Sequence, residues 1–372
     1  MSAEVVNRFS SSVLQQLYVS QKGSGCVSLS GIGLYVMMGA LNIGLRGRSF
    51  DQLSQFLRED FSELFVNDTW RDSTTAKKWS DLYLASQYPS NMKSAMFYPD
   101  DINPYYEQIS KSIFELGLVQ INLSNSAETA QKINRWITRN IDDGMVWNMI
   151  EESILRENTL NFISTISIQT DWKNKFDSAY TDQEIFFDDK NQYFEVEMMN
   201  QISNYHIYDS TSNNFAILFK PFTTPELYSV IILPRYSSNV DQVLNEIKFD
   251  QMHIYFEKAE LKYAKLQLPK FKIRNPHDFS QVLINMGITD IFDRNVSDFG
   301  RITNRTIAMG ILMQVVNVAI DENGDDSPNV EDLQIQSSEY EEEFLVTRPF
   351  LFLIYSNNLV HFSTVVTNPN FC

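Results

Sequence analysis

Residues 324–343 form an acidic segment between two hydrophobic stretches. Ile311–Ile320 and Phe344–Tyr355 are rich in Val, Ile, Leu and Phe, and both patterns are typical of buried strands. The segment between them carries eight acidic residues and no Lys, Arg or His. Loops longer than about 12–15 residues are uncommon in compact domains and are usually functional or disordered. The sequence therefore predicts either a solvated acidic linker or an exposed loop held between two core strands.

The bulk composition restricts the partners of the chain. Of its 372 residues, 43% are hydrophobic and 13% aromatic, which is enough to build a large core. The net charge of −17 argues against nucleic acid or an anionic membrane as the main partner and favours a basic protein. No apolar run is long enough for a transmembrane helix. Met1–Asn7 lacks the pattern of a secretory leader, so we expect a cytoplasmic protein or leaderless release, and we expect a monomer.

The residues that usually carry catalysis or bind metals do not form a recognisable motif. There is no GxSxG or HExxH motif, and the four histidines are scattered at His206, His253, His277 and His361. His253 and Glu257 could share a helical face, but two ligands without a third are typical of a polar surface. The only cysteines, Cys26 and Cys372, predict neither a disulfide framework nor a CxxC metal site. We therefore predict that the chain is not an enzyme and uses no cofactor or metal.

The order of predicted elements indicates one composite α+β domain over residues 1–372. The first 145 residues are mainly helical, with amphipathic patterns at 6–17, 104–117 and 124–143 and a short alternating strand at 81–87. The remainder consists mainly of strands, with helices expected at 243–247 and 275–286. Because the helix-rich part cannot close a core without the strand-rich part, we predict a single domain.

Several segments together resemble the serpin superfamily, and the match covers nearly the whole chain. The segments are INRWITRNIDDGM (133–145), QTDWKNKF (169–176), LQLPKFKI (266–273), VLINMGITDIF (282–292), VAIDENG (318–324), TRPFLFLI (347–354) and TVVTNP (364–369). Each is weak alone, but their order and spacing are specific. The distance from Gly324 to Pro349 also resembles that between the hinge glycine and the C-terminal Pro-Phe of serpins.

This resemblance implies three β-sheets, about nine helices and an exposed reactive-centre loop within residues 324–343. In inhibitory members, a serine protease attacks the loop as a substrate. The cleaved loop then inserts as a new central strand of the large sheet and traps the acyl-enzyme. The native fold is metastable because it lacks the pairing and burial of that strand until cleavage.

The resemblance also assigns individual residues. Trp172 matches the tryptophan at the top of the large sheet, Glu322 the hinge glutamate and Lys270 the basic residue that pairs with it. The loop length places the reactive bond at Ser338–Glu339. Tyr340 is the alternative bait, and it suits a chymotrypsin-like pocket; an elastase-like protease is the other candidate. No Arg or Lys precedes Arg348 for a trypsin-like pocket.

The hinge departs from the pattern of inhibitory serpins, which have small residues after the hinge glycine. Here the corresponding residues are Gly324, Asp325, Asp326, Ser327, Pro328 and, further along, Glu331. Alternate residues starting at Asp325 would face the core after insertion, so Asp325 and Glu331 would be buried. A buried unpaired carboxylate costs several kcal/mol, and Pro328 cannot donate a ladder hydrogen bond. We therefore expect impaired insertion and weak or substrate-like inhibition.

A second departure concerns the buried polar cluster beneath the large sheet. The family commonly has Asn and His where this chain has Ser164 and Gln314; Gly31 replaces a serine, and Ser28 is retained. We expect a rewired hydrogen-bond network at this place. Two classes of function remain open: a protease inhibitor or decoy substrate, and a non-inhibitory serpin that acts as a binding, carrier or storage module.

Overall fold

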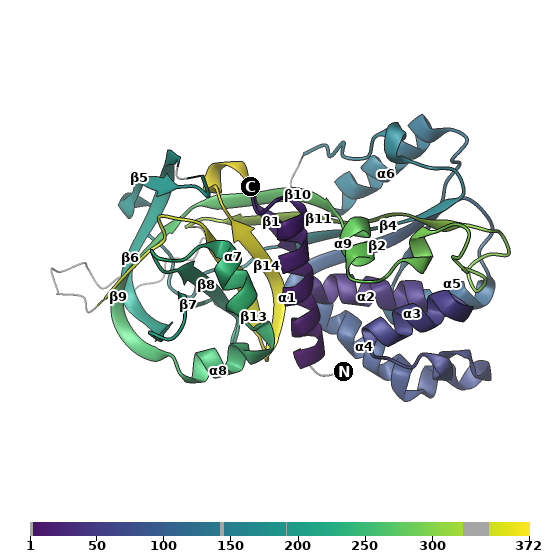
Figure 1. Cartoon of the computed structure of the whole chain (residues 1–372), viewed down its shortest axis with the longest axis horizontal. Helices are drawn as coiled ribbons and strands as arrows, with labels where there is room; N and C mark the ends of the chain where they lie inside the picture. The colour runs from purple at the N-terminus through teal and green to yellow at the C-terminus, as the bar shows by residue number, and fades with distance from the viewer. Residues whose placement is uncertain (1–2, 142–144, 191, 323–341) are drawn as a thin grey trace. The chain divides into compact units, whose positions relative to one another are not determined.

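The computed structural model describes residues 3–141, 145–190, 192–322 and 342–372 (Figure 1). The chain divides into two compact units, one comprising Ile32–Ser167 and Asn275–Asn317 and the other comprising Ser2–Gly31, Ile168–Arg274 and Val318–Cys372. Both units are assembled from separated stretches of sequence. The mixed α+β class that the sequence predicts is confirmed by their helices and strands, whereas the single-domain assignment remains a prediction.

The first unit contains most of the helices. Its α-helices are α2 (Gly31–Asn42, which begins at the unit boundary), α3 (Gly47–Leu57), α4 (Thr74–Ser86), α5 (Pro104–Phe114), α6 (Ser126–Asn140) and α9 (Ser280–Asn285). Asn103 caps α5 by accepting a hydrogen bond from the amide of Tyr105 at 2.9 Å, and Pro104 occupies the first turn. The cap and proline thus begin α5 at the position that the sequence predicts.

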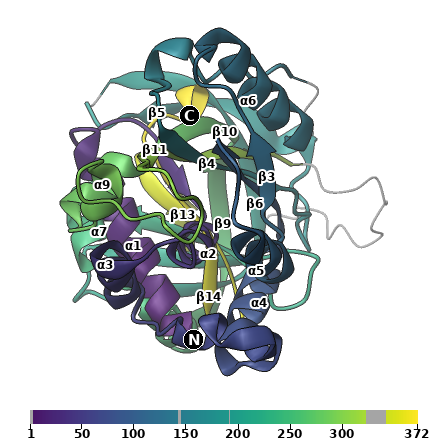
Figure 2. The same cartoon turned by 90° about the vertical axis from the view of Figure 1, so that its right-hand side faces the viewer.

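A five-stranded sheet accompanies these helices in the order β10-β11-β4-β2-β3. Its strands are β2 (Ser90–Tyr98), β3 (Gly117–Gln120), β4 (Thr159–Ile168), β10 (Phe271–Asp278) and β11 (Ala308–Ile320). Figure 2 shows β4 and β11 side by side. Ile133 and Ile137 of α6 pack in one buried cluster with Phe97, Ile163 and Ile311 of this sheet. The 3.6-residue period of α6 therefore places its apolar side on the sheet.

The second unit is dominated by a nine-stranded sheet in the order β1-β14-β13-β8-β7-β6-β9-β12, with β5 paired to β6. The strands are β1 (Val27–Leu29), β5 (Thr181–Phe187), β6 (Tyr193–Asp209), β7 (Phe215–Pro221), β8 (Tyr228–Pro234), β9 (Glu260–Pro269), β12 (Glu342–Leu345), β13 (Phe350–Ser356) and β14 (Leu359–Val366). Every residue of β13 and β14 is buried. These two strands therefore form the centre of the core of this unit.

Three α-helices belong to the second unit, namely α1 (Ala3–Ser20), α7 (Val240–Glu246) and α8 (Met252–Glu257). Figure 1 shows α1, in purple, alongside β14. Buried Asn7 of α1 donates to the carbonyls of Phe249 at 3.2 Å and Asn358 at 2.8 Å, and its side-chain oxygen accepts from the amide of Val360 at 2.9 Å. A polar side chain at the core side of α1 is thus fully used to hold the turn before β14.

The described residues contain two hydrogen-bonded sheets where the resemblance implies three. Strand β6 is 17 residues long and pairs with β5 near its start, with β9 over its middle and with β7 near its end. Because β6 pairs with β5 and β9 as well as with β7, the strands on both sides of β6 form one continuous sheet. The nine α-helices in the described part of the chain agree with the expected number.

Three local expectations are wrong. Residues 81–86 belong to α4, on which Ala76, Trp79 and Tyr83 are buried at helical spacing, and Gln87 is the C-cap of this helix. Residues 275–278 continue β10, so that α9 begins only at Ser280. The two cysteines form a disulfide, Cys26–Cys372, with their Cα atoms 5.3 Å apart. None of the helices in the described part of the chain is long and apolar enough to cross a membrane.

Candidate functional site

The residues on both sides of segment 323–341 are fixed to regular structure in the second unit. Upstream, β11 ends at Ile320, two residues before the last described residue, Glu322. Downstream, β12 begins at Glu342 and pairs in parallel with β9, with Glu342 opposite Ala264. The candidate site consists of these two flanks and the side chains that hold them.

Trp172 holds the main chain immediately before the segment. Its indole N–H donates to the carbonyl of Asp321 at 2.8 Å. The ring is buried and stacks on Phe222, with ring centroids 4.7 Å apart and an interplanar angle of 15°. The two residues also form an isolated antiparallel bridge. The upstream flank is therefore attached to a rigid aromatic pair.

Lys270 and Glu322 form an ion pair at the same flank. Lys270 Nζ lies 2.9 Å from Glu322 Oε1, and Thr181 Oγ1 donates to that oxygen at 2.6 Å. Burial raises the pKa of Glu322, but the hydrogen bonds from Lys270 and Thr181 outweigh it, so that the net pKa is lowered. Lys270 also lies 3.4 Å from Glu197 Oε1. Glu322 is thus held as a carboxylate by two donors.

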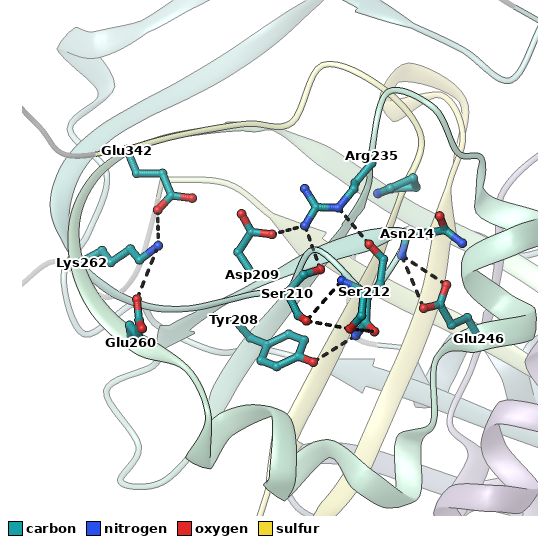
Figure 3. Close-up of polar contacts among 12 residues, drawn as sticks. Tyr208, Asp209, Ser210, Ser212, Asn214, Arg235, Glu246, Glu260, Lys262 and Glu342 are labelled. Carbon is teal, nitrogen blue, oxygen red and sulfur yellow. Dashed lines mark hydrogen bonds and ion pairs between the residues drawn. The ribbon is translucent and has the colours of Figure 1, made fainter.

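A second lysine holds the downstream flank. Lys262 Nζ lies 2.7 Å from Glu342 Oε2 and 3.7 Å from Glu260 Oε2, and Figure 3 shows it between the two carboxylates. The hydrogen bond to Glu342 raises the pKa of Lys262 despite the opposing effect of partial burial. The first residue of β12 is therefore tied to β9 by a side chain as well as by strand pairing.

Figure 3 also shows a polar cluster that joins the β6–β7 turn to the end of β8. Arg235 forms an ion pair with Asp209 and donates to the carbonyls of Ser210 and Asn213, each at 2.9 Å. Main-chain bonds fix this turn, because Arg235 N donates to the carbonyl of Asn214 at 2.8 Å. These contacts account for the local order of the turn and need no ligand.

Both anchoring lysines belong to one strand and its immediate continuation. Lys262 is the third residue of β9, and Lys270 follows directly after the last residue, Pro269. Eight residues of extended chain span about 27 Å. The contour length between the two lysines that hold the flanks of segment 323–341 is therefore of that order.

The five-stranded sheet has no vacant position between β4 and β11 in the described residues. These strands are direct hydrogen-bonded neighbours in the sheet order. A further strand could pair between them only after their hydrogen bonds had separated. Strand β11 ends three residues before segment 323–341.

The predicted polar cluster falls on buried positions. Ser164 of β4 and Gln314 of β11 are fully buried on these neighbouring strands. Ser28 of β1 is also fully buried, within the second unit. Gly31 lies so close to α1 that an added Cβ would be 1.9 Å from Ser10 Oγ and 2.9 Å from Ser10 Cα. Glycine is therefore needed at this position for close packing.

Other predicted site residues lie outside the described part of the chain. They are Gly324, Asp325, Asp326, Ser327, Pro328 and Glu331 of the hinge, and Ser338, Glu339 and Tyr340 at the bait position. The structure in turn reveals Thr181, Lys220 and Lys262, which no sequence motif indicates. A lysine inside the apolar run AILFKPF was the available signal for Lys220. Within the described ranges, no three His, Cys, Asp or Glu residues gather as a metal site.

Comparison with known proteins identifies the family. The family model described as "Serpin (serine protease inhibitor)" matches residues 4–369. This chain belongs to the serpin family. Human Serpin I2 is 23% identical over 383 residues, covering 99% of this chain and 92% of its own. The structure of uncleaved ovalbumin superposes with a TM-score of 0.86 at 21% identity and covers 99% of this serpin and 100% of its own chain.

A third solved structure illustrates the range of proteins on this fold. Thyroxine-binding globulin in complex with thyroxine gives a TM-score of 0.85 at 18% identity, and the match covers 99% of both chains. Identities of this size show a shared fold only. The family is that of protease inhibitors rather than enzymes.

Proposed function

We propose that this serpin presents residues 324–343 to a chymotrypsin-like or elastase-like serine protease, and that it reacts mainly as a substrate rather than as a stable inhibitor. The observation that carries this proposal is the anchoring of both flanks, through Lys270–Glu322 after the end of β9 and through Lys262–Glu342 on β9. This anchoring supports the proposal because Glu322 and Glu342, on either side of the bait residues, are both held in place. The bait bond is Ser338–Glu339, with the bond after Tyr340 as the alternative.

The second half of the proposal concerns the fate of the cleaved loop. Trapping requires that the released strand pair between β4 and β11, which are already bonded to each other. Insertion would bury Asp325 and Glu331, each at a cost of several kcal/mol, and Pro328 would leave one ladder position without a donor. An acyl-enzyme waiting for slow insertion is hydrolysed, and the protease leaves unharmed.

Incubation with chymotrypsin and with pancreatic elastase tests this directly. Products are separated by denaturing electrophoresis under reducing conditions, and the new N-terminus is sequenced. We expect cleavage after Ser338 or Tyr340, no band heavier than the serpin, and full recovery of protease activity. A denaturant-resistant complex between protease and serpin would show that insertion keeps pace with deacylation and would overturn the proposal.

The alternative is a non-inhibitory binding, carrier or storage module. This alternative is supported by one solved structure on the same fold, thyroxine-binding globulin in complex with thyroxine. Resistance of residues 324–343 to both proteases, with the rest of the chain intact, would favour the alternative. Rapid cleavage confined to that segment favours the protease-directed function.

A further inference from the structure

Lys220 is a buried lysine that has no part in anchoring either flank. It lies in β7, within the second unit, and only 1% of its surface is exposed. Lysine is almost never fully buried unless its amine is paired. The surroundings of this amine therefore indicate why a lysine is placed here.

The amine of Lys220 is enclosed by three rings and two oxygens. Its Nζ donates to the carbonyl of Asn174 at 2.8 Å and to the side-chain oxygen of Gln201. It lies 4.5 Å from the ring centroid of Phe176, 5.1 Å from that of Trp172 and 5.5 Å from that of Tyr205. The contacts thus come from residues 172–176 on one side and from β6 on the other.

Gln201 and Tyr205 complete this cluster. Tyr205 donates its hydroxyl to Gln201 Oε1 at 2.8 Å, and the Gln201 amide donates to the carbonyl of Lys175. Segment 172–176 contains no helix, and its main chain meets β7 at the Trp172–Phe222 bridge, next to which Lys173 N donates to the carbonyl of Pro221 at 3.1 Å. Lys220 and Gln201 are therefore main supports that hold this segment against the sheet.

One side chain connects Lys220 to the base of the loop. Trp172 contacts the Lys220 amine with its ring face and binds the Asp321 carbonyl with its indole N–H. Asp321 directly precedes Glu322, which binds Lys270. A displacement of Trp172 would release the main chain at the point where segment 323–341 begins.

We propose that Lys220 is a positioning residue for the base of the loop. It holds residues 172–176 against β6 and β7 and thereby fixes Asp321 through Trp172. This hold loosens when the Lys220 amine takes up a proton. Protonation weakens the closed arrangement because the charged amine would be buried away from water, and both oxygens that accept from it belong to neutral groups. Burial lowers the pKa of Lys220 to about 7. The positioning does not depend on the proposed function, but its effect on loop presentation does.

Other titratable groups lie on the elements around Lys220. Tyr205 of β6 is neutral at all physiological pH values, because burial raises its pKa further. Lys173 and Lys175 lie on the opposing segment, and Asp171 accepts from Thr223 through its main chain. His206 follows Tyr205 on β6, and its ring lies 5.2 Å from Phe256, on the other side of the strand. His206 is therefore the group that a pH experiment must control for.

The test is hydrogen exchange of the full chain followed by mass spectrometry at pH 6 and pH 8, corrected for intrinsic exchange rates. If the open state restores the ordinary affinity of the amine for a proton, the opening equilibrium of residues 172–176 rises about tenfold from pH 8 to pH 6. We expect this loss of protection in the wild type and in the exposed-lysine control Lys248→Met. We expect it to be absent in Lys220→Met and retained in His206→Gln.

If Lys220→Met does not fold, a second measurement tests the proposal in the wild-type protein. In wild-type protein labelled with 5-fluorotryptophan, the Trp172 resonance, assigned with Trp172→Phe, should titrate with a midpoint near pH 7. A Trp172 resonance that does not change between pH 5.5 and pH 9 would overturn the proposal. So would a pH response that persists in Lys220→Met or disappears in His206→Gln. None of these readouts depends on whether a protease recognises the loop.

Discussion

Glu322 accepts hydrogen bonds from both Lys270, at 2.9 Å, and Thr181, at 2.6 Å, directly before the segment that the family uses as its reactive loop. The Lys270 side chain is 26% exposed, whereas that of Glu322 is 7% exposed. The Glu322 carboxylate is therefore shielded from water, whereas the Lys270 amine remains partly solvated. The contribution of the pair lies between that of a surface and that of a buried ion pair.

Glu322→Gln should lower the free energy of unfolding by about 1–2 kcal/mol at pH 7. Because the pKa of folded Glu322 is lowered, its contribution is present above the unfolded pKa and is lost as the pH falls through the folded pKa. Urea unfolding between pH 3 and pH 7 should therefore show a smaller acid loss in the variant. An equal acid loss in both proteins would contradict this. Thr181→Val, which removes only the neutral donor, is the matched control.

Lys262→Met should mainly affect the downstream flank. Both partners of the Lys262–Glu342 pair are 25% exposed, so we expect a loss of less than about 1 kcal/mol that diminishes at high salt. Exchange of the amides of β12 should increase, because this four-residue strand lies at the edge of its sheet. Glu260→Gln is the control, since Glu260 lies 3.7 Å away and should change little. Unchanged β12 exchange in Lys262→Met would mean that strand pairing alone holds the flank.

Gly31→Ala should destabilise the protein by about 1–3 kcal/mol through overpacking. An added Cβ would approach Ser10 Oγ to 1.9 Å, Cβ to 2.4 Å and Cα to 2.9 Å. Because the main chain of α1 is involved, Ser10→Gly should relieve only part of the loss. Thermal unfolding of the single and double variants measures this. Complete rescue by Ser10→Gly would show that α1 itself need not move.

The hinge hypothesis predicts that only the carboxylates on the inward-facing side of the inserted strand oppose insertion. Asp325→Ala combined with Glu331→Ala removes the two carboxylates that insertion would bury, on the order of 3 kcal/mol each. With Pro328→Ala added, the cleaved protein should melt at a higher temperature than the intact one, and some denaturant-resistant complex should form. The matched control is Asp326→Ala with Asp332→Ala and Pro328→Ala, which removes outward-facing carboxylates. Equal gains in both variants would refute the alternation argument.

The sequence predicts elements whose signal is local and repeated. Val6, Phe9, Val13 and Leu17 define α1 because one buried side recurs over several turns. Helix α4 also has one buried side, but residues 81–87 taken alone alternate like a strand. The buried residues Ala76 and Trp79, which reveal the helical period, lie before this stretch. Strand β10 continues to Asp278 because of its neighbours in the sheet, which no local pattern around Pro276 indicates.

The candidate site is predictable only where a motif names the residue. Trp172, Lys270 and Glu322 lie in segments that resemble the family. Lys262 meets Glu342 only because β12 runs parallel to β9 in one particular register. Lys220 is buried by Trp172 and Tyr205, which are far from it in sequence. Pairings of this kind depend on tertiary structure, so propensity and periodicity cannot reveal them.

The Cys26–Cys372 bond has a consequence for any cut between residues 324 and 343. It joins the residue before β1 to the last residue of the chain, so it closes a covalent ring of nearly the entire polypeptide. Cleavage at the proposed bond opens this ring without dividing the molecule, and the piece from Glu339 to Cys372 stays bonded to the remainder. Because β13 and β14 of the shorter piece lie in the core, the two pieces would separate only when the disulfide is reduced and the fold is also denatured. The oxidation state of a single cysteine pair thus decides whether one proteolytic event gives one polypeptide or two after denaturation.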